Sequence, residues 1–344
     1  MREPEQLPIP LLLWYRENAR KLPWRGIKDP YRIWLSEVML QQTRVAVVLE
    51  YYRRFLEALP TVEALAACPD DELMKLWQGL GYYSRARNLK KAAQVVTEQY
   101  GGRFPNTYEG LRALPGVGEY TAGAVASIAF GVTVPAVDGN VLRVLARITG
   151  DESDVTLPAT KKEAARVLKA VMPTTAPGEF NQAMMELGAT VCLPNGAPLC
   201  SRCPAKEFCA ALQTERIGSL PVKPPKKPRR VEVRTVYLLF RGDRVALRKR
   251  PEKGLLAGLW EYPNALKEEA PPVEGLRWTQ AGTGKHIFTH IEWHMTAMTA
   301  EAQSNALPEG WVWADRQEIE KVYAIPGAFD AFKPWVEERF KKMG

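Results

Sequence analysis

Long apolar runs, histidine and dispersed cysteine are all scarce in this chain of 344 residues. No window of about eighteen uninterrupted apolar residues exists, which excludes a membrane-spanning helix. Cys68 is the one cysteine outside a single short cluster, and no apolar signal segment opens the sequence. This usage argues against a secreted disulfide framework and predicts a reducing compartment, with Cys68 as a buried spectator.

Acidic residues are also in deficit. The chain has 47 lysines and arginines against 39 aspartates and glutamates, which gives a formal net charge of +8. This excess favours a polyanionic partner such as nucleic acid, although an ordinary solvated surface would show the same balance. Because 46% of the residues are hydrophobic, the chain is expected to be soluble and folded, with two or three domains.

Four cysteines lie within eighteen residues, at Cys192, Cys200, Cys203 and Cys209. Thiols this close together in a reducing compartment indicate a metal site. The gaps of seven, two and five residues do not repeat the CxxC pair that is typical of zinc ribbons. The spacing therefore favours a 4Fe-4S cluster, with zinc as the alternative.

The sequence divides at a basic, proline-rich stretch, residues 217–231, which we expect to be a linker. Before it, residues 1–216 repeat apolar positions at intervals of three and four, and an all-α domain is expected. This pattern is clearest in Trp34–Leu59, Asp70–Tyr100 and Tyr108–Phe130.

After the linker, the apolar period falls to two, which is typical of strands. The alternating runs are Val231–Phe240, Arg244–Arg250 and Ile287–Thr299, and a helical stretch follows at Pro326–Lys342. Residues 232–344 are therefore expected to form an α+β domain.

The segment from Leu114 to Gly118, LPGVG, is typical of a turn that opens a helix. The unsatisfied amides at the start of such a helix suit a phosphate, and glycine allows close approach of the backbone to it. Gly116 and Gly118 are thus candidate contacts to a nucleic-acid backbone. A turn between helices with no ligand is the alternative.

Two carboxylates occur in unlike settings. Glu37 lies in the apolar run from Trp34 to Thr43, where its pKa should rise unless a buried salt bridge pairs it. Asp138 precedes a glycine at an expected helix start facing a cleft, where a role as N-cap would also explain it. One acid and one ionised carboxylate are what cleavage of a glycosidic bond requires.

Four features together resemble the helix-hairpin-helix DNA glycosylases, and most closely the MutY-type adenine DNA glycosylases. They are LPGVGEYTAGA, which begins at Leu114, VDGNV, which begins at Val137, SEVMLQQT, which begins at Ser36, and the cysteine cluster. The resemblance covers nearly the whole chain. It implies base excision repair of duplex DNA, in which adenine opposite 8-oxoguanine or guanine is flipped out of the helix and removed.

The resemblance implies a role for each catalytic candidate. Glu37 protonates the adenine ring, Asp138 stabilises the cationic sugar, and Asn140 and Tyr120 support that sugar. Tyr120 stands where endonuclease III relatives have a Schiff-base lysine, so a monofunctional enzyme is expected. An endonuclease III-like glycosylase/lyase for oxidised pyrimidines and a non-catalytic iron-sulfur DNA-binding protein are the competing interpretations.

Residues that would bind the substrate follow from the same resemblance. The adenine pocket would contain Arg20, Trp24 and Gln182. The lesion side would contain Gln42, Thr43, Leu80 and Tyr82. Tyr82 would act as a wedge on the flexible turn Gly79–Tyr83, with a core position as the alternative.

The region 232–344 resembles the Nudix fold, with Gly258–Pro263 in a hairpin, but it lacks a Nudix box. Because Glu268 and Glu269 lack the spacing needed to hold magnesium, pyrophosphatase activity is not expected. The run Phe288, Thr289 and His290 resembles the family's lesion-reading loop, with threonine in place of serine.

All three histidines, His286, His290 and His294, lie four residues apart in an apparently alternating strand. Residues four apart on a strand are separated by about 13 Å, so we do not expect a shared zinc ion. The resemblance also implies that the four clustered cysteines hold a 4Fe-4S cluster. The expected protein is a monomer in the bacterial cytoplasm, associated with the nucleoid and with no membrane contact.

Overall fold

The computed structural model describes residues 4–225 and 227–343, so Lys226 of the expected linker lies outside the described residues. Its contacts divide the chain into two compact units. The helical unit contains the chain up to Ala67 and the segment Asn88–Pro225. The mixed unit combines Cys68–Arg87 with the chain from residue 227 onward. A short helical segment from the first half of the sequence therefore packs with the C-terminal strands.

The predicted helical domain is confirmed, although the long periodic runs are broken into shorter helices. Its elements are α1 (Pro8–Asn18), α2 (Pro30–Leu40), α3 (Val45–Ala58), α4 (Val62–Ala67), α6 (Ser84–Tyr100), α7 (Tyr108–Arg112), α8 (Glu119–Phe130), α9 (Gly139–Thr149), α10 (Pro158–Val171), α11 (Pro177–Thr190), η1 (Cys200–Arg202), η2 (Lys206–Phe208) and α12 (Ala210–Gln213). Within the described residues, no helix is long and apolar enough to cross a membrane.

Small residues bring the helices of this unit close together. Gly123 of α8 lies against the backbone of Pro135, where an added Cβ would come within 2.6 Å of the carbonyl oxygen. An added Cβ at Gly178 of α11 would come within 2.8 Å of the backbone of Ser127 and Ile128. Because α8 packs against both α2 and α11, side chains from three helices can face one cleft.

The mixed unit contains a seven-stranded sheet, with the strand order β3-β2-β1-β6-β5 and with β4 and β7 paired to β1 and β2. The parallel pairing of β1 with β6 forms its centre, and the other pairings are antiparallel. The strands are β1 (Arg230–Arg241), β2 (Arg244–Lys249), β3 (Trp260–Glu261), β4 (Asn264–Leu266), β5 (Thr279–Ile287), β6 (Ile291–Glu301) and β7 (Trp311–Ala314). The remaining helices are α5 (Asp70–Trp77), α13 (Arg316–Lys321), η3 (Gly327–Phe332) and α14 (Lys333–Met343).

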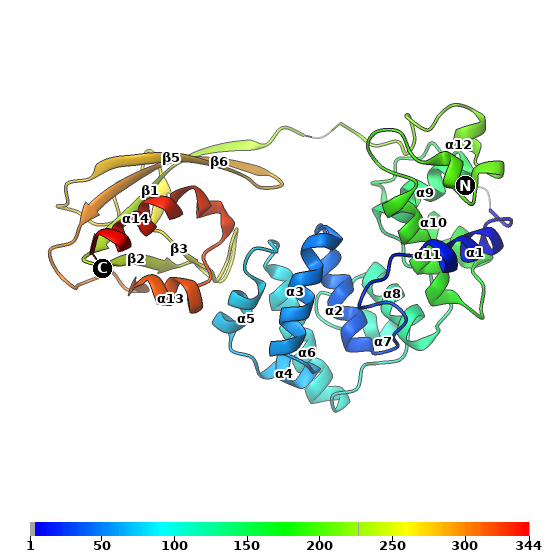
Figure 1. Ribbon diagram of the computed structural model, residues 1–344, viewed down its shortest axis with the longest axis horizontal. Coiled ribbons are helices and arrows are strands. Elements are labelled where there is room, and N and C mark those ends of the chain that lie inside the picture. Colours follow the sequence, from blue (N-terminus) through cyan, green and yellow to red (C-terminus); the bar gives the residue numbers. More distant parts are fainter. Residues whose placement is uncertain (1–3, 226, 344) are drawn as a thin grey trace. The chain divides into compact units, whose positions relative to one another are not determined.

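One face of the sheet is covered by the C-terminal helices (Figure 1). Phe329 and Phe332 of η3 are completely buried, and Trp293 of β6 packs in the same core. Full burial of a large apolar side chain stabilises the folded state by about 1.5–3 kcal/mol, so these three aromatic residues contribute substantially to folding. This core makes the unit an independent hydrophobic body.

Polar side chains attach α5 to the strand-bearing part of the same unit. The Lys75 ammonium donates to the carbonyl oxygens of Ile319 (2.8 Å) and Tyr323 (3.3 Å). The Gln78 amide donates to the carbonyl of Ile325 at 2.6 Å. These bonds satisfy carbonyls at and just beyond the end of α13, which would otherwise lack partners.

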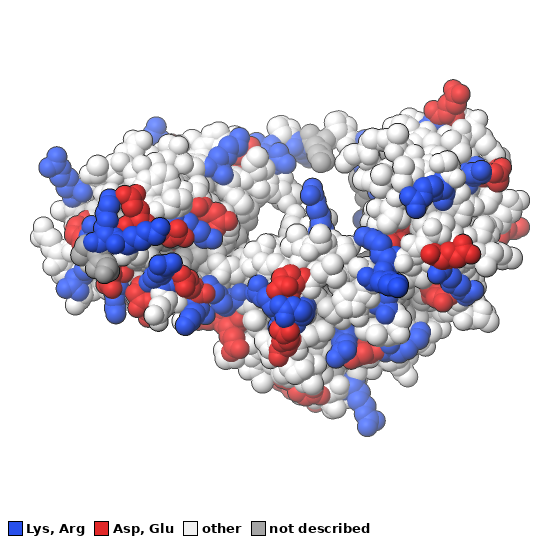
Figure 2. All heavy atoms as spheres, in the orientation of Figure 1, with Lys and Arg blue, Asp and Glu red and all other residues white. Residues whose placement is uncertain are grey.

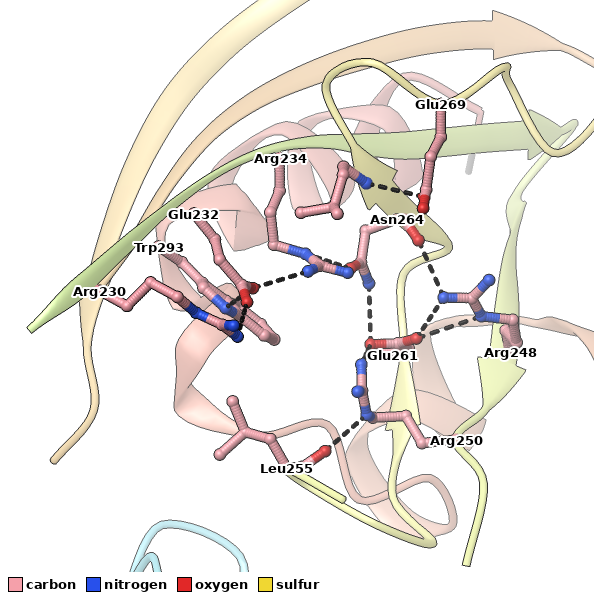
Figure 3. Close-up of polar contacts among 11 residues, drawn as sticks. Arg230, Glu232, Arg234, Arg248, Arg250, Leu255, Glu261, Asn264, Glu269 and Trp293 are labelled. Atoms are coloured by element: carbon pink, nitrogen blue, oxygen red, sulfur yellow. Dashed lines mark hydrogen bonds and ion pairs between the residues drawn. The ribbon is translucent and has the colours of Figure 1, made fainter. Parts of the chain in front are cut away.

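A buried charged group joins four strands of the mixed unit (Figure 3). Glu261 of β3 is completely buried and accepts hydrogen bonds from Arg248 and Arg250, each at 2.6 Å, and from Asn264 at 2.8 Å. Arg234 of β1 then donates to the Asn264 amide oxygen at 2.9 Å. Leaving one member of such a group unpaired typically costs about 3–5 kcal/mol, so the cluster fixes how these strands meet.

Of two expectations for the strands, one is confirmed and one was wrong. The Gly258–Pro263 segment lies in a hairpin, because β3 pairs antiparallel with the preceding strand β2. The alternating run Ile287–Thr299 is not one strand, because the chain turns at Phe288–His290 between β5 and β6. His286 and His294 therefore lie on neighbouring strands, and the single-strand spacing used to separate the histidines does not apply.

Candidate active site

A cleft in the helical unit collects many of the residues that the sequence singled out. Its lining includes nine of them and also Arg25, Arg143, Met185 and Glu186. The nine are Arg20, Trp24, Glu37, Gln42, Thr43, Tyr120, Asp138, Asn140 and Gln182. The helices α2, α8, α9 and α11 each contribute at least one of these side chains.

Glu37 lies on α2, and its side chain is buried. Burial raises the pKa of this carboxyl group to about 7, and the nearby Asp138 also raises it. A hydrogen bond from Tyr120 and the positive charge of Arg25 act in the opposite direction and lower the pKa. No cation forms an ion pair with Glu37 within the described part of the chain. The sequence-based expectation of a raised pKa is confirmed, and the alternative of a buried salt bridge is not.

Tyr120 is positioned by the hairpin between α7 and α8. Gly116 has a φ of +72°, and an added Cβ there would meet the Asn88 side chain at 2.5 Å, so this position requires glycine. Gly118 precedes α8 as its N-cap and faces open space. Two residues later, the Tyr120 hydroxyl donates to Glu37 Oε2 at 2.5 Å and contacts Met185 Sδ at 3.5 Å.

Asp138 is the N-cap of α9 and also lines the cleft. Its Oδ1 accepts from the amide of Val141 at 2.7 Å, and its Oδ2 accepts from the Asn140 side chain at 2.9 Å. Arg143, which is buried, donates to Asn140 Oδ1 at 2.9 Å and to the carbonyl of Cys192 at 2.9 Å. The capping role and a place in the cleft are thus compatible, because two donors fix the carboxylate without covering it.

An ion-pair group at the cleft wall was not predicted from the sequence. Glu186 of α11 is completely buried and accepts two hydrogen bonds from the Arg20 guanidinium, each at 2.7 Å, and one from Arg25 at 2.5 Å. These hydrogen bonds outweigh the effect of burial and lower the Glu186 pKa to about 2. The sequence does carry a signal for this group, because Glu186 is a lone carboxylate in the apolar stretch Phe180–Leu187. Glu37 was identified by the same pattern.

Five sequence candidates belong to the mixed unit, on two surface turns. Leu80 is buried, whereas Tyr82 is 50% exposed with a φ of +48°, which excludes the core position considered for it. The Arg85 guanidinium lies 5.6 Å from the Tyr82 ring centre and donates to the carbonyls of Leu80 and Gly81. The turn therefore presents an aromatic ring on a fixed backbone.

The β5–β6 turn carries the other three candidates. Phe288 packs on Trp293 with ring centres 4.8 Å apart, while Thr289 and His290 are exposed. The hydroxyl groups of Thr289 and Tyr82 lie 3.2 Å apart, within one hydrogen bond. Two segments that are more than two hundred residues apart in the sequence therefore offer neighbouring polar groups at the surface of this unit.

The four clustered cysteines line one small, otherwise mostly apolar cavity beside α9 and α11. Arg147 donates to Cys192 Sγ at 3.3 Å and to the carbonyl of Leu193 at 2.9 Å. In residues 4–225 and 227–343, no three His, Cys, Asp or Glu side chains come close enough together to hold a single metal ion. A four-iron cube bonds each cysteine to a different iron, so it does not require the four sulfurs to converge on one point.

Charge does not by itself locate a binding face. On the face shown in Figure 2, Lys and Arg side chains are interspersed with Asp and Glu. The net charge of +8 is therefore a weaker guide to the site than the cleft and its lining residues.

Comparisons with known proteins agree with this geometry. Residues 35–173 match the model of the HhH-GPD superfamily of base excision DNA repair proteins, and residues 235–332 match a NUDIX domain. The adenine DNA glycosylase of Mus musculus is 36% identical over 90% of this chain and 74% of its own length. The same enzyme of Buchnera aphidicola is 34% identical over 83% of this chain and 82% of its own length. The chain belongs to the adenine DNA glycosylase family.

This adenine DNA glycosylase family member is thus an enzyme of base excision repair whose substrate is DNA. Among solved structures, a thermostable thymine-DNA glycosylase is 30% identical with a TM-score of 0.54, over 60% of this chain and 94% of that one. A trapped endonuclease III–DNA covalent intermediate is 26% identical with a TM-score of 0.53, over 62% of this chain and 99% of that one.

Proposed function

We propose that this glycosylase, acting as a monomer, hydrolyses the N-glycosidic bond of adenine paired with 8-oxoguanine or guanine and leaves the DNA strand intact. The observation that carries the proposal is the shared cleft of Glu37 and Asp138. One carboxyl group has a pKa raised to about 7, and the other is held by two hydrogen-bond donors. Two carboxylates in such different environments suit an acid and a stabiliser of positive charge.

Glu37 is the proposed general acid. With a pKa of about 7, a substantial fraction of this carboxyl group is protonated at neutral pH. Adenine that has been flipped out of the duplex into the cleft can take this proton on its ring, and the protonated base is a better leaving group. The Tyr120 hydroxyl, through its hydrogen bond to Oε2, orients the carboxyl group for the transfer.

Asp138 is the proposed stabiliser of the sugar. Departure of the base leaves positive charge on the sugar ring, and a fixed carboxylate lowers the energy of that state. The hydrogen bonds from Val141 and Asn140 hold the carboxylate in place before the reaction. Arg143 holds Asn140 in turn, so the group requires little reorganisation.

Tyr120 supports the monofunctional part of the proposal. Strand cleavage of the lyase type needs an amine that forms a Schiff base with the sugar, and a phenol cannot do this. Burial raises the Tyr120 pKa well above 10, so its hydroxyl also keeps its proton at neutral pH.

The two bases of the mispair would contact different groups of residues. Arg20, Trp24 and Gln182 are proposed to surround adenine, since all three line the cleft with Glu37. For 8-oxoguanine, the proposed contacts are Gln42, Thr43, Leu80, Tyr82, Phe288, Thr289 and His290. The half-exposed Tyr82 ring suits insertion between stacked bases, and the Thr289 hydroxyl is a hydrogen-bonding group beside it.

DNA backbone contact and the metal cluster complete the proposal. The amides at the start of α8, after Gly116 and Gly118, would bind a phosphate. Cys192, Cys200, Cys203 and Cys209 would hold a 4Fe-4S cluster, which their shared apolar cavity and the Arg147–Cys192 contact support. When bound, the cluster would fix the loop that carries the exposed Arg202 and Lys206, both suited to phosphate contact.

The Glu37→Gln variant tests the proposal. The amide preserves shape and hydrogen-bonding reach but has no proton to transfer, so the full-length variant should bind an A:8-oxoguanine duplex and release no adenine. Product strands resolved with and without alkali would show whether the wild-type enzyme nicks DNA. Substantial excision by the variant, or nicking by the wild type without alkali, would contradict the proposal.

A further inference from the structure

Behind the adenine side of the cleft lies a tyrosine that does not itself line it. Tyr15 of α1 is buried, and its hydroxyl donates to Gln182 Oε1 on α11 at 2.6 Å. Gln182 is part of the cleft lining, whereas Tyr15 lies outside it. The hydrogen bond therefore holds, from outside the cleft, Oε1 of a residue that lines it.

This contact fixes which end of the Gln182 amide is the acceptor. Within the described residues, the Gln182 Nε2 group donates to no protein acceptor, and the Tyr15 hydroxyl has no other acceptor than Oε1. If the amide turned over, Nε2 would face the hydroxyl and the buried hydroxyl hydrogen would lose its acceptor. A buried donor without a partner costs about 1–3 kcal/mol, so one orientation dominates.

The ion-pair group described above fixes Tyr15 in turn. The Arg25 guanidinium lies 5.4 Å from the centre of the Tyr15 ring and is bonded to Glu186 and to the carbonyl of Arg20. Burial raises the pKa of the Tyr15 hydroxyl, which keeps it protonated and able to donate. Neither partner in the Tyr15–Gln182 contact is therefore free to rearrange.

We propose that Tyr15 is a positioning residue that sets base specificity by fixing the orientation of the Gln182 amide. This inference rests on the proposed place of Gln182 in the adenine pocket. A glutamine amide recognises adenine by accepting from the N6 amino group and donating to N7. Oε1 has two lone pairs, so it can accept from Tyr15 and from adenine together. A base with a carbonyl at position 6 would place its oxygen against Oε1 and be rejected.

The test compares adenine with hypoxanthine, which has oxygen in place of the amino group at position 6. Single-turnover excision of each base opposite 8-oxoguanine is measured with the full-length wild type and with Tyr15→Phe. We expect the ratio of the adenine rate to the hypoxanthine rate to fall about fivefold or more in the variant. A ratio is used because a loss of folded enzyme lowers both rates alike and leaves the ratio unchanged.

A matched control separates this effect from the loss of any buried tyrosine hydroxyl. Tyr31 is buried and donates to the carbonyl of Leu59 at 2.8 Å, and it does not line the cleft. Tyr31→Phe should leave the ratio at its wild-type value. If Tyr15 acts through Gln182, then Tyr15→Phe should have no further effect on the ratio in a Gln182→Leu background.

An unchanged ratio of the adenine rate to the hypoxanthine rate in Tyr15→Phe would overturn the inference. The inference would also be overturned if Tyr15→Phe lowered this ratio as much in the Gln182→Leu background as in the wild type. Failure of the proposed function has a different signature, because the wild type would then release no adenine opposite 8-oxoguanine. The wild-type measurement therefore distinguishes the two.

Discussion

The Tyr120 hydroxyl donates a hydrogen bond of 2.5 Å to Glu37 Oε2 across 83 residues of sequence. The bond favours the ionised carboxylate and so lowers the Glu37 pKa, whereas burial raises it more strongly. The result is a pKa of about 7, close to the pH at which a general acid is most effective. Tyr120 therefore lowers the pH range over which Glu37 carries its proton.

Tyr120→Phe should shift the pH dependence of adenine excision. Glu37 acts in its protonated form, so the wild-type rate should fall as pH rises through about 7. Without the hydroxyl, the effect that lowers the Glu37 pKa is lost, and the fall should move to higher pH. Single-turnover rates between about pH 5.5 and 9 measure this shift. A fall at the wild-type pH or below would contradict the assigned role of the hydrogen bond.

Glu37→Gln should alter stability in a pH-dependent way. The carboxyl group has a pKa of about 7 in the folded chain against 4.5 for an unperturbed group. Between these values, the native state keeps a proton that the unfolded state has lost, so wild-type stability falls as pH rises. The variant does not lose stability in this way. Its free energy of unfolding relative to that of the wild type should therefore increase by on the order of 3 kcal/mol above pH 7. Urea unfolding at pH 4 and pH 8 measures the difference, and an equal effect at both values would contradict a buried, neutral Glu37.

Several parts of the fold and site follow from local sequence patterns. The helical periodicity and the change to period two after the linker depend on neighbours within a few residues. The direction of the Glu37 pKa shift follows from its apolar run, whereas its size also depends on the distant Tyr120 and Asp138. Other parts depend on distant partners. The packing of Cys68–Arg87 with the C-terminal strands rests on Lys75 and Gln78 reaching backbone carbonyls, which no sequence pattern marks.

The alternation of apolar residues missed the turn at Phe288–His290, although the family resemblance implied a loop there. The segment contains no glycine, proline or asparagine, so nothing interrupts the alternation that predicted a continuous strand. The Tyr15–Gln182 contact was missed for a different reason, since its partners are 167 residues apart. Sequence spacing identifies which residues are unusual, whereas their partners become visible only in three dimensions.

The cysteine cluster predicts iron in the purified protein. Anaerobically prepared enzyme should be brown and contain about four irons per chain, as expected for a four-iron cluster held by four cysteine thiolates. Cys203→Ser should lower iron content, stability and DNA binding together, because metal binding is coupled to folding of the loop. Cys68→Ser is the matched control, since Cys68 is buried outside the cavity and should leave the iron content unchanged. Stoichiometric zinc without iron would contradict the assignment.

Thr289→Val should weaken recognition of the lesion without reducing the intrinsic chemistry. The substitution keeps the branched shape but removes the hydroxyl that lies 3.2 Å from that of Tyr82. The preference for A opposite 8-oxoguanine over A opposite guanine should fall about tenfold, the value of one lost specific contact. Thr299→Val, which also removes a threonine hydroxyl from this unit, is the control and should keep the preference. Full retention of the preference in Thr289→Val would exclude Thr289 as a reader of the lesion.

The most direct test of the account is a glycosylase assay of the wild-type enzyme on duplexes that pair A, C, G or T with 8-oxoguanine. The enzyme should release adenine alone, with the strand intact until alkali is added. The Glu37→Gln variant should bind the A:8-oxoguanine duplex as the wild type does and release nothing. Removal of another base at a comparable rate, or adenine release that survives the loss of the Glu37 carboxyl group, would contradict the account.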